Sequence, residues 1–144
     1  MGSLVGTVGS SSGYIAFTVS GNWVKPSGIQ WIYVVIYGGG GGGQGGANDL
    51  SGAGFGIGGS GGSCVVKMFS AAQITSPVPV TVGAGGSGSS GSSTSTAAAN
   101  GGMGGTSSFG DYAIAYGGAN NTGASTLANS TGTITPSTPD AANA

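Results

Sequence analysis

The chain has 144 residues, of which 35 are glycine and only 3% are charged, and its formal net charge is −1. This length fits one domain, and the near-absence of charge excludes electrostatic steering toward nucleic acid or anionic lipid. A Gly/Ser-rich composition is typical of disorder, but 38% of the residues are hydrophobic and they cluster in short bursts, which favours an ordered fold.

The N-terminal third of the chain is expected to form strands. Residues 1–13 are interpreted as an N-terminal arm that carries no secretory signal peptide. Residues 14–20, "YIAFTVS", alternate with the period of two that is typical of a half-buried strand. The "KPSG" sequence at 25–28 then predicts a turn, because proline presets φ and glycine can take a positive φ.

The next stretch, "IQWIYVVIY" at 29–37, is the strongest strand signal in the sequence. Both of its faces are apolar, so we predict a central strand that is covered on both sides. We expect this strand to supply much of the core. The predicted core residues are Phe17, Trp23, Trp31, Tyr33, Val35, Val66, Val80 and Ile114.

The rest of the chain alternates glycine-rich stretches with short apolar ones. Gly38 to Ser63 predicts a long loop, because glycine lacks a side chain to pack and loses much backbone entropy on ordering. Residues 63–69 predict a strand, and residues 77–82 predict an edge strand, since their prolines cannot donate ladder hydrogen bonds.

A second long loop, one last strand and a tail complete the prediction. The last strand is expected within residues 107–118, after a low-complexity loop that begins at residue 83. Residues 119–144 are interpreted as an extended or disordered tail, so the β domain covers 14–118. No helix is expected. The predicted fold class is all-β, an antiparallel β-sandwich with long glycine-rich loops.

The sequence offers no constellation for catalysis or for a cofactor. It contains no His and no Glu, and its three Asp residues are far apart. Cys64 has no His partner, and a zinc site would need several Cys or His ligands. The glycine run satisfies G-x-G-x-x-G trivially, but neither a helix nor a suitably placed acidic residue follows it. We therefore expect no enzyme activity, no catalytic residue, no metal and no cofactor.

The glycine run itself is the candidate binding element. Two interpretations stay open: a flexible loop on a small β domain, or an ordered surface that binds a partner through backbone amides. Extended, polyproline-II-like packing is possible for glycine-rich segments, although the chain lacks a strict G-x-y period. The candidate surface-binding residues are Gly38, Gly39, Gly40, Gly41, Gly42 and Gly43.

We also expect oligomerisation, because two long loops leave a modest core. A homotrimer is predicted. Aromatic residues are favoured at interfaces, and the candidate interface residues are Tyr37, Phe69 and Tyr116.

The order of these elements resembles the glycine-rich domain of bacteriophage tail fibres and minor tail proteins. The resemblance covers about residues 14–118. Its motifs are a "G-x-W-x-x-P-x-G" turn at 21–28, polyglycine at 38–43, "V-x-V-G-A-G-G" at 80–86, "S-S-F-G" at 107–110 and a final "GG" at 117–118.

The resemblance implies a β-sandwich displayed on a virion, and a similarity to trimeric jelly-roll proteins implies a jelly-roll arrangement as an option. It implies a tail-fibre or tail-tip, adhesin-like structural protein that contacts other virion proteins and a host-surface glycan or protein. A capsid decoration protein or head fibre with a mechanical role is the alternative. We expect no nucleic acid partner and no insertion into a membrane.

Overall fold

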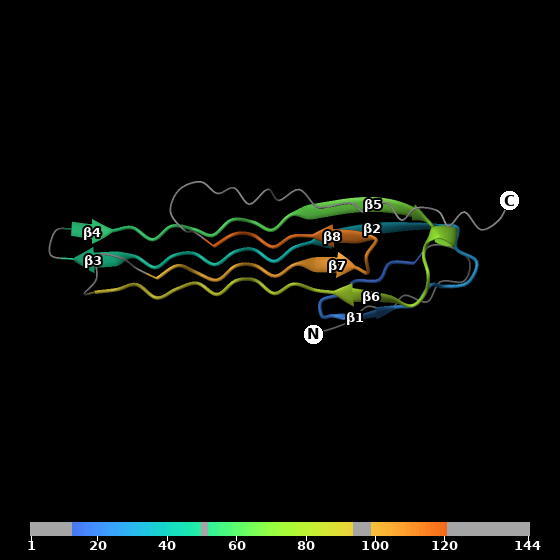
Figure 1. The fold of residues 1–144 in the computed structure, drawn as a ribbon, viewed down its shortest axis with the longest axis horizontal. Helices are drawn as coiled ribbons and strands as arrows, with labels where there is room; N and C mark the ends of the chain where they lie inside the picture. Colours follow the sequence, from blue (N-terminus) through green and yellow to red (C-terminus); the bar gives the residue numbers. More distant parts are fainter. Residues whose placement is uncertain (1–12, 50–51, 94–98, 121–144) are drawn as a thin grey trace.

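The computed structural model of the chain describes residues 13–49, 52–93 and 99–120. The predicted N-terminal arm and the predicted tail lie almost wholly outside these ranges. Within them the fold is all-β: eight strands and a single 3-10 helix, η1, at Ala71–Gln73. The strands gather mainly at one end of an elongated molecule, and glycine-rich segments run from them to the other end (Figure 1).

Two antiparallel sheets at the strand-rich end pack face to face like an open sandwich. The first sheet has the order β1-β6-β7-β8, formed by Gly21–Trp23, Val78–Thr81, Ser107–Phe109 and Ala113–Ala115. The second pairs β2 (Trp31–Tyr37) with β5 (Cys64–Ser70), and it contacts β7 and β8. The predicted all-β, antiparallel fold class is confirmed.

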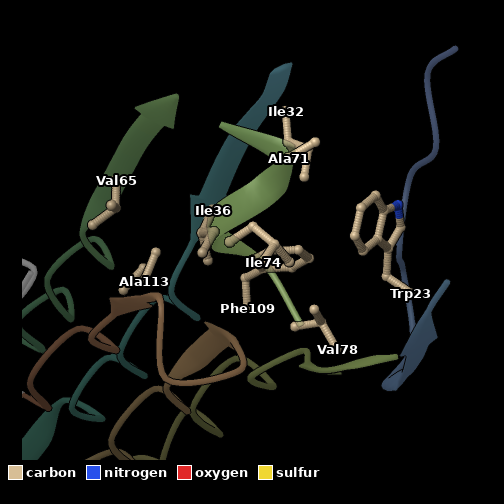
Figure 2. Close-up of a cluster of buried hydrophobic side chains, with 10 residues drawn as sticks. Trp23, Ile32, Ile36, Val65, Ala71, Ile74, Val78, Phe109 and Ala113 are labelled. Carbon is tan, nitrogen blue, oxygen red and sulfur yellow. The ribbon is translucent and has the colours of Figure 1, made fainter. Parts of the chain in front are cut away.

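The core lies between these two sheets. Isoleucines from the inward face of β2 meet Phe109 of β7, whose ring lies edge-on to Trp23 with 5.4 Å between ring centroids. Ile36, Ile74 and Phe109 lie close together at its centre (Figure 2). The buried hydrophobic residues are Trp23, Ile32, Ile36, Val65, Ala71, Ile74, Val78, Phe109, Ala113 and Ala115.

The prediction that β2 is covered on both sides is wrong. Only the even-numbered residues of β2, such as Ile32 and Ile36, point into the core, whereas Trp31 is 63% exposed. The reason is that, among the described residues, a single sheet packs on the β2–β5 sheet, and it covers one side. The predicted core residues Trp31, Tyr33, Val35 and Val66 are therefore all exposed.

The other predicted core residues are buried or partly buried. Trp23 is buried, and Phe17 and Val80 are partly buried against the core. Ile114 is also only partly buried, because it points away from the face that carries Ala113 and Ala115.

Two predicted strands differ from the observed ones. Residues 14–20 form no strand, and the chain first pairs at β1. Strand β6 is not at an edge, since it lies between β1 and β7. Pro79 is tolerated there because the β7 ladder starts only at Val80, and its carbonyl accepts a hydrogen bond from the Gly110 amide at 2.7 Å.

The predicted last strand is a hairpin. Strand β7 turns at Gly110, whose φ of 50° lies in the left-handed region that favours glycine, and the chain returns as β8. The absence of helix was predicted, and η1 is the exception. The Lys25 ammonium donates hydrogen bonds to the carbonyl oxygens of Ala71, the first residue of η1, and of Ile74, which follows it, both at 2.9 Å.

Candidate functional site

The two predicted loops are extended segments that lie side by side and form a bundle. We call this the glycine bundle; it comprises residues 38–46, 55–63, 82–92, 99–106 and 116–120 (Figure 1). The segments continue directly from the strands at the sandwich end. Their mutual backbone hydrogen bonds therefore replace the loop structure that the sequence predicts.

Segment 38–46 lies in the middle of this bundle, and its hydrogen bonds repeat every third residue. Along one side, its amides bond to segment 55–63 in antiparallel fashion, with Gly38 donating to the Ser63 carbonyl at 2.9 Å. The other bonds of this side run from the Gly41 amide to the Ser60 carbonyl and from the Gln44 amide to the Ile57 carbonyl.

On its remaining sides, segment 38–46 also makes hydrogen bonds that recur at every third residue. The amides of Gly39 and Gly42 donate to Gly105 and Gly102, at 2.9 and 2.8 Å. On a further side its carbonyls accept bonds from the parallel segment 82–92. These bonds run from Gly86, Ser89 and Ser92 to Gly40, Gly43 and Gly46. Successive residues of segment 38–46 therefore bond to different neighbouring segments, and this bonding pattern repeats after three residues. Three residues per turn is the periodicity of polyproline II.

The packing explains the spacing of the glycines. In segment 55–63 one position in three points into the bundle, whereas in segment 38–46 Gly38, Gly39, Gly41, Gly42 and Gly45 all do. A Cβ atom on Gly41 would lie 2.1 Å from the Ala119 carbonyl oxygen, and one on Gly59 would lie 2.2 Å from the Gly41 carbonyl oxygen. Such positions admit no side chain. By contrast, a Cβ atom on Gly58 or Gly61 would meet nothing within 4 Å, because these residues point outward.

Two buried serines join the bundle to the sandwich. Ser63 donates both its amide and its hydroxyl to the Tyr116 carbonyl, at 2.9 and 3.0 Å. The Ser107 hydroxyl accepts a hydrogen bond from the Gly83 amide at 2.9 Å. These bonds satisfy polar groups that would be costly to bury unpaired, and they fix where the bundle leaves the sheets.

The far end of the bundle carries a small hairpin. Strands β3 (Ala47–Asp49) and β4 (Gly52–Gly54) pair there, well away from the other strands (Figure 1). Phe55 follows β4 directly and is 91% exposed. At about 3.1 Å per residue, the nine residues of segment 38–46 span roughly 28 Å between β2 and this hairpin.

A second surface lies on the outward side of the β2–β5 sheet. We call it the β2–β5 face. Its cross-strand pairs place Tyr33 opposite Met68 and Tyr37 opposite Cys64. Apart from Cys64 and Ser70 at its ends, the face consists of the exposed apolar residues Trp31, Tyr33, Val35, Tyr37, Val66 and Met68.

The β2–β5 face carries three titratable side chains, namely Tyr33, Tyr37 and Cys64. The hydrogen bond with Cys64, together with the electrostatic interaction with that side chain, raises the pKa of Tyr37 above its ordinary value of 10.0. The eight outward residues of the ladder include no Asp, Glu, Lys or Arg side chain.

The described residues contain no group of three or more His, Cys, Asp or Glu side chains that could hold a metal ion. Nor does that part of the chain include a helix long and apolar enough to cross a bilayer.

A comparison with protein families matches the description "glycine-rich domain" over residues 16–144. The chain belongs to the glycine-rich domain family. Neither the curated proteins nor the solved structures give a match to this glycine-rich domain. The matched range includes both the sandwich and the glycine bundle.

The structure places the predicted surface-binding run in the centre of the glycine-rich domain. The Gly38, Gly39, Gly41 and Gly42 amides all donate within the chain, and Gly42 is buried. Gly40 is the most open of the six glycines. A binding role for this run stays a prediction, but a partner would have to meet groups other than these four amides.

The three candidate interface residues of the glycine-rich domain do not share one surface. Tyr37 is on the β2–β5 face, and Tyr116 is partly exposed where the chain leaves β8. Phe69 points the other way from Tyr37 and lies edge-on to Tyr112, with 6.0 Å between ring centroids. The serine anchors Ser63 and Ser107 were missed, although the period of three in "GIGGSGGS" at 56–63 signals where one of them lies.

Proposed function

We propose that this chain is a non-enzymatic structural protein of a phage virion, displayed as a tail-fibre or tail-tip component that binds a host surface in the manner of an adhesin. The proposal rests on the architecture of the glycine bundle. Its support comes from four features, namely shape, rigidity, surface chemistry and the order of sequence motifs.

The observation that carries the proposal is the separation of the β3–β4 hairpin from the sandwich by the hydrogen-bonded bundle (Figure 1). Long segments without secondary structure are normally mobile or functional. Here they are cross-linked by backbone bonds every third residue, so they act as a stiff spacer. A stiff spacer that ends in a short hairpin suits a protein that must present a contact surface away from its attachment point.

The surface chemistry restricts what such a tip recognises. The chain has only five charged side chains, so ion pairs contribute little to its contacts. Exposed backbone, serine hydroxyls and single apolar residues such as Phe55 remain. These groups suit a neutral glycan or an uncharged protein surface, where hydrogen bonds and apolar burial supply the affinity.

The motif order adds independent support. The turn at 21–28, the polyglycine run at 38–43 and the segments at 80–86 and 107–110 occur in the order of the glycine-rich domains of phage tail fibres and minor tail proteins. Membership of the glycine-rich domain family agrees with this likeness at the coarser level.

The location of the protein on a particle tests the proposal first. Gold-labelled antibodies against the chain should mark few sites, at the tail, in electron micrographs of the phage that encodes it. Many sites spread over the capsid shell would instead support a decoration protein with a mechanical role. The absence of label from intact particles would refute both functions.

Competition with phage adsorption tests the binding role. The purified chain should reduce adsorption of that phage to its host, and Phe55→Ser at the hairpin end should weaken the competition. Val19→Ser is the matched control, because Val19 is 73% exposed but belongs to the strand-rich end. Equal loss with both variants, or no competition by the native chain, would contradict recognition by the hairpin end.

A further inference from the structure

We infer that the β2–β5 face is a self-association surface, on which a second copy of this chain docks face to face. This inference does not depend on the proposed function. It starts from the outward residues of the two longest strands in the described part of the chain, β2 and β5.

The first argument is the size of the apolar surface. Trp31, Tyr33 and Tyr37 are 63%, 69% and 68% exposed, and Val35, Val66 and Met68 fill the space between and beside them. Burying an aromatic side chain removes about 150–250 Å² from water, so the face exposes roughly 600 Å² of apolar side chain. This is at the upper limit for a patch on a monomer and close to the roughly 800 Å² that each partner contributes to a standard interface.

The second argument is the shape of the face. Seven paired residues make a ladder about 23 Å long, with side chains standing perpendicular to the sheet. The opposite side of the same ladder already packs in this way against β7 and β8. A second β2–β5 face, packed about 10 Å away, would give the outer side the same kind of cover, as in a β-sandwich.

The third argument concerns charge and selects the partner. In a two-fold interface the same patch of both copies meets itself, so charges of one sign on the face would be brought together and would repel. The eight outward residues of the ladder, from Trp31 to Tyr37 and from Cys64 to Ser70, include no charged side chain. Lys67, the charged residue of β5, points to the other side.

A single flat face that meets itself closes as a dimer. The homotrimer expected from the sequence would need a second, different surface complementary to this one. The face belongs to the strand-rich end, and the β3–β4 hairpin lies at the opposite end of the molecule (Figure 1).

The test measures mass and Trp31 environment on the full chain across concentrations from about 1 to 100 µM, the range in which an interface of this size and modest quality associates. Sedimentation velocity should show the mass rise from one chain to two. Over the same range the emission of Trp31 should shift to the blue, whereas the other tryptophan, Trp23, is already buried.

Tyr33→Asp should raise the dimer dissociation constant about 30-fold or more, as expected for a central aromatic residue of an interface. Tyr14→Asp is the matched control, because Tyr14 is 76% exposed and lies off the face, and it should leave the constant unchanged. If Tyr33→Asp does not fold, Met68→Lys on the neighbouring strand makes the same test.

Three results would overturn the inference. A single-chain mass at every concentration would mean that no second copy docks. A blue-shifted Trp31 at single-chain mass and at every dilution would mean that another part of the same chain covers the face. A trimer whose stability is insensitive to Tyr33→Asp would place the contact elsewhere.

Discussion

Alanine substitutions at neighbouring glycines of segment 55–63 test the glycine bundle most directly. Gly59 points into the bundle, and a Cβ atom there would lie 2.2 Å from the Gly41 carbonyl oxygen and 2.4 Å from its carbon. Carbon atoms normally pack at about 3.5–4.0 Å, so Gly59→Ala must push two backbone segments apart by more than about 1 Å.

The expected cost follows from two contributions. Overpacking in a close-packed interior costs about 1–3 kcal/mol. The displacement also strains the two hydrogen bonds of the adjacent residue, in which the Ser60 carbonyl accepts from Gly41 and the Ser60 amide donates to Ala119, each worth about 1 kcal/mol. We therefore expect Gly59→Ala to lower the free energy of unfolding by about 3–5 kcal/mol.

The neighbouring position supplies the control. A Cβ atom on Gly58 would meet nothing within 4 Å, and its φ lies outside the left-handed region. Gly58→Ala should therefore stabilise the protein slightly, by about 0.4–1 kcal/mol, because alanine restricts the unfolded chain. The pair Gly62 and Gly61 repeats the comparison one period later, with 2.1 Å to the Gly38 carbonyl oxygen against open space.

Denaturant unfolding followed by circular dichroism measures all four variants under the same conditions. Hydrogen exchange at the Gly41 amide then reports whether the loss is in the bundle. If Gly58→Ala and Gly59→Ala change stability by the same amount, the three-residue packing described for this segment is wrong.

Three further predictions concern the sandwich and its contacts. In a denaturant titration below about 1 µM, where the chain is expected to be a single copy, Trp23→Ala should cost about 3–5 kcal/mol, as for other buried aromatic residues, whereas Trp31→Ala should cost less than about 1 kcal/mol because its side chain is exposed in the single chain; the reverse order would contradict the assignment of the two faces of β2. The raised pKa of Tyr37 means that the stability from its neutral hydroxyl is present below about pH 10 and is lost as pH rises through the higher folded-state pKa; in an ultraviolet titration Cys64→Ala should return this tyrosine toward its ordinary pKa, and an unchanged titration would refute the role of the thiol. Under the proposed function, in which the chain binds through apolar and hydrogen-bonding groups, attachment to the host surface should be nearly constant from low salt to about 1 M salt and between about pH 6 and 8; a steep loss of binding with salt would show that charges govern the contact.

Much of the sandwich could be predicted because strand signals are local. The alternation of Val65, Lys67 and Phe69 against Cys64, Val66 and Met68 gives β5 and the two sides of its ladder. The apolar run at 29–37 likewise gives β2. A short apolar run indicates a strand through its own residues alone, so this prediction needs no knowledge of the rest of the chain.

The same local signal could not tell which side of β2 would be covered. Ile32 and Trp31 are both strongly apolar, and only the position of the β7–β8 hairpin decides that the isoleucine side is buried. The edge prediction for residues 77–82 failed for a related reason. Strand β1 is distant from β6 in the sequence but pairs with it in the sheet. It lies on the side of β6 opposite to the Pro79 carbonyl, which bonds to Gly110, so the missing amide hydrogen of Pro79 costs no hydrogen bond to β1.

The glycine content by itself determines that some backbone segments can approach closely, since no side chain keeps them apart. The sequence also contains the inward glycines at the spacing of three in residues 56–62. Which segments meet was decided only by the tertiary structure. A polyproline-II-like segment makes no hydrogen bonds within itself, so its amides can bond only to neighbouring segments. These neighbours are present because the strands of the sandwich place five such segments side by side.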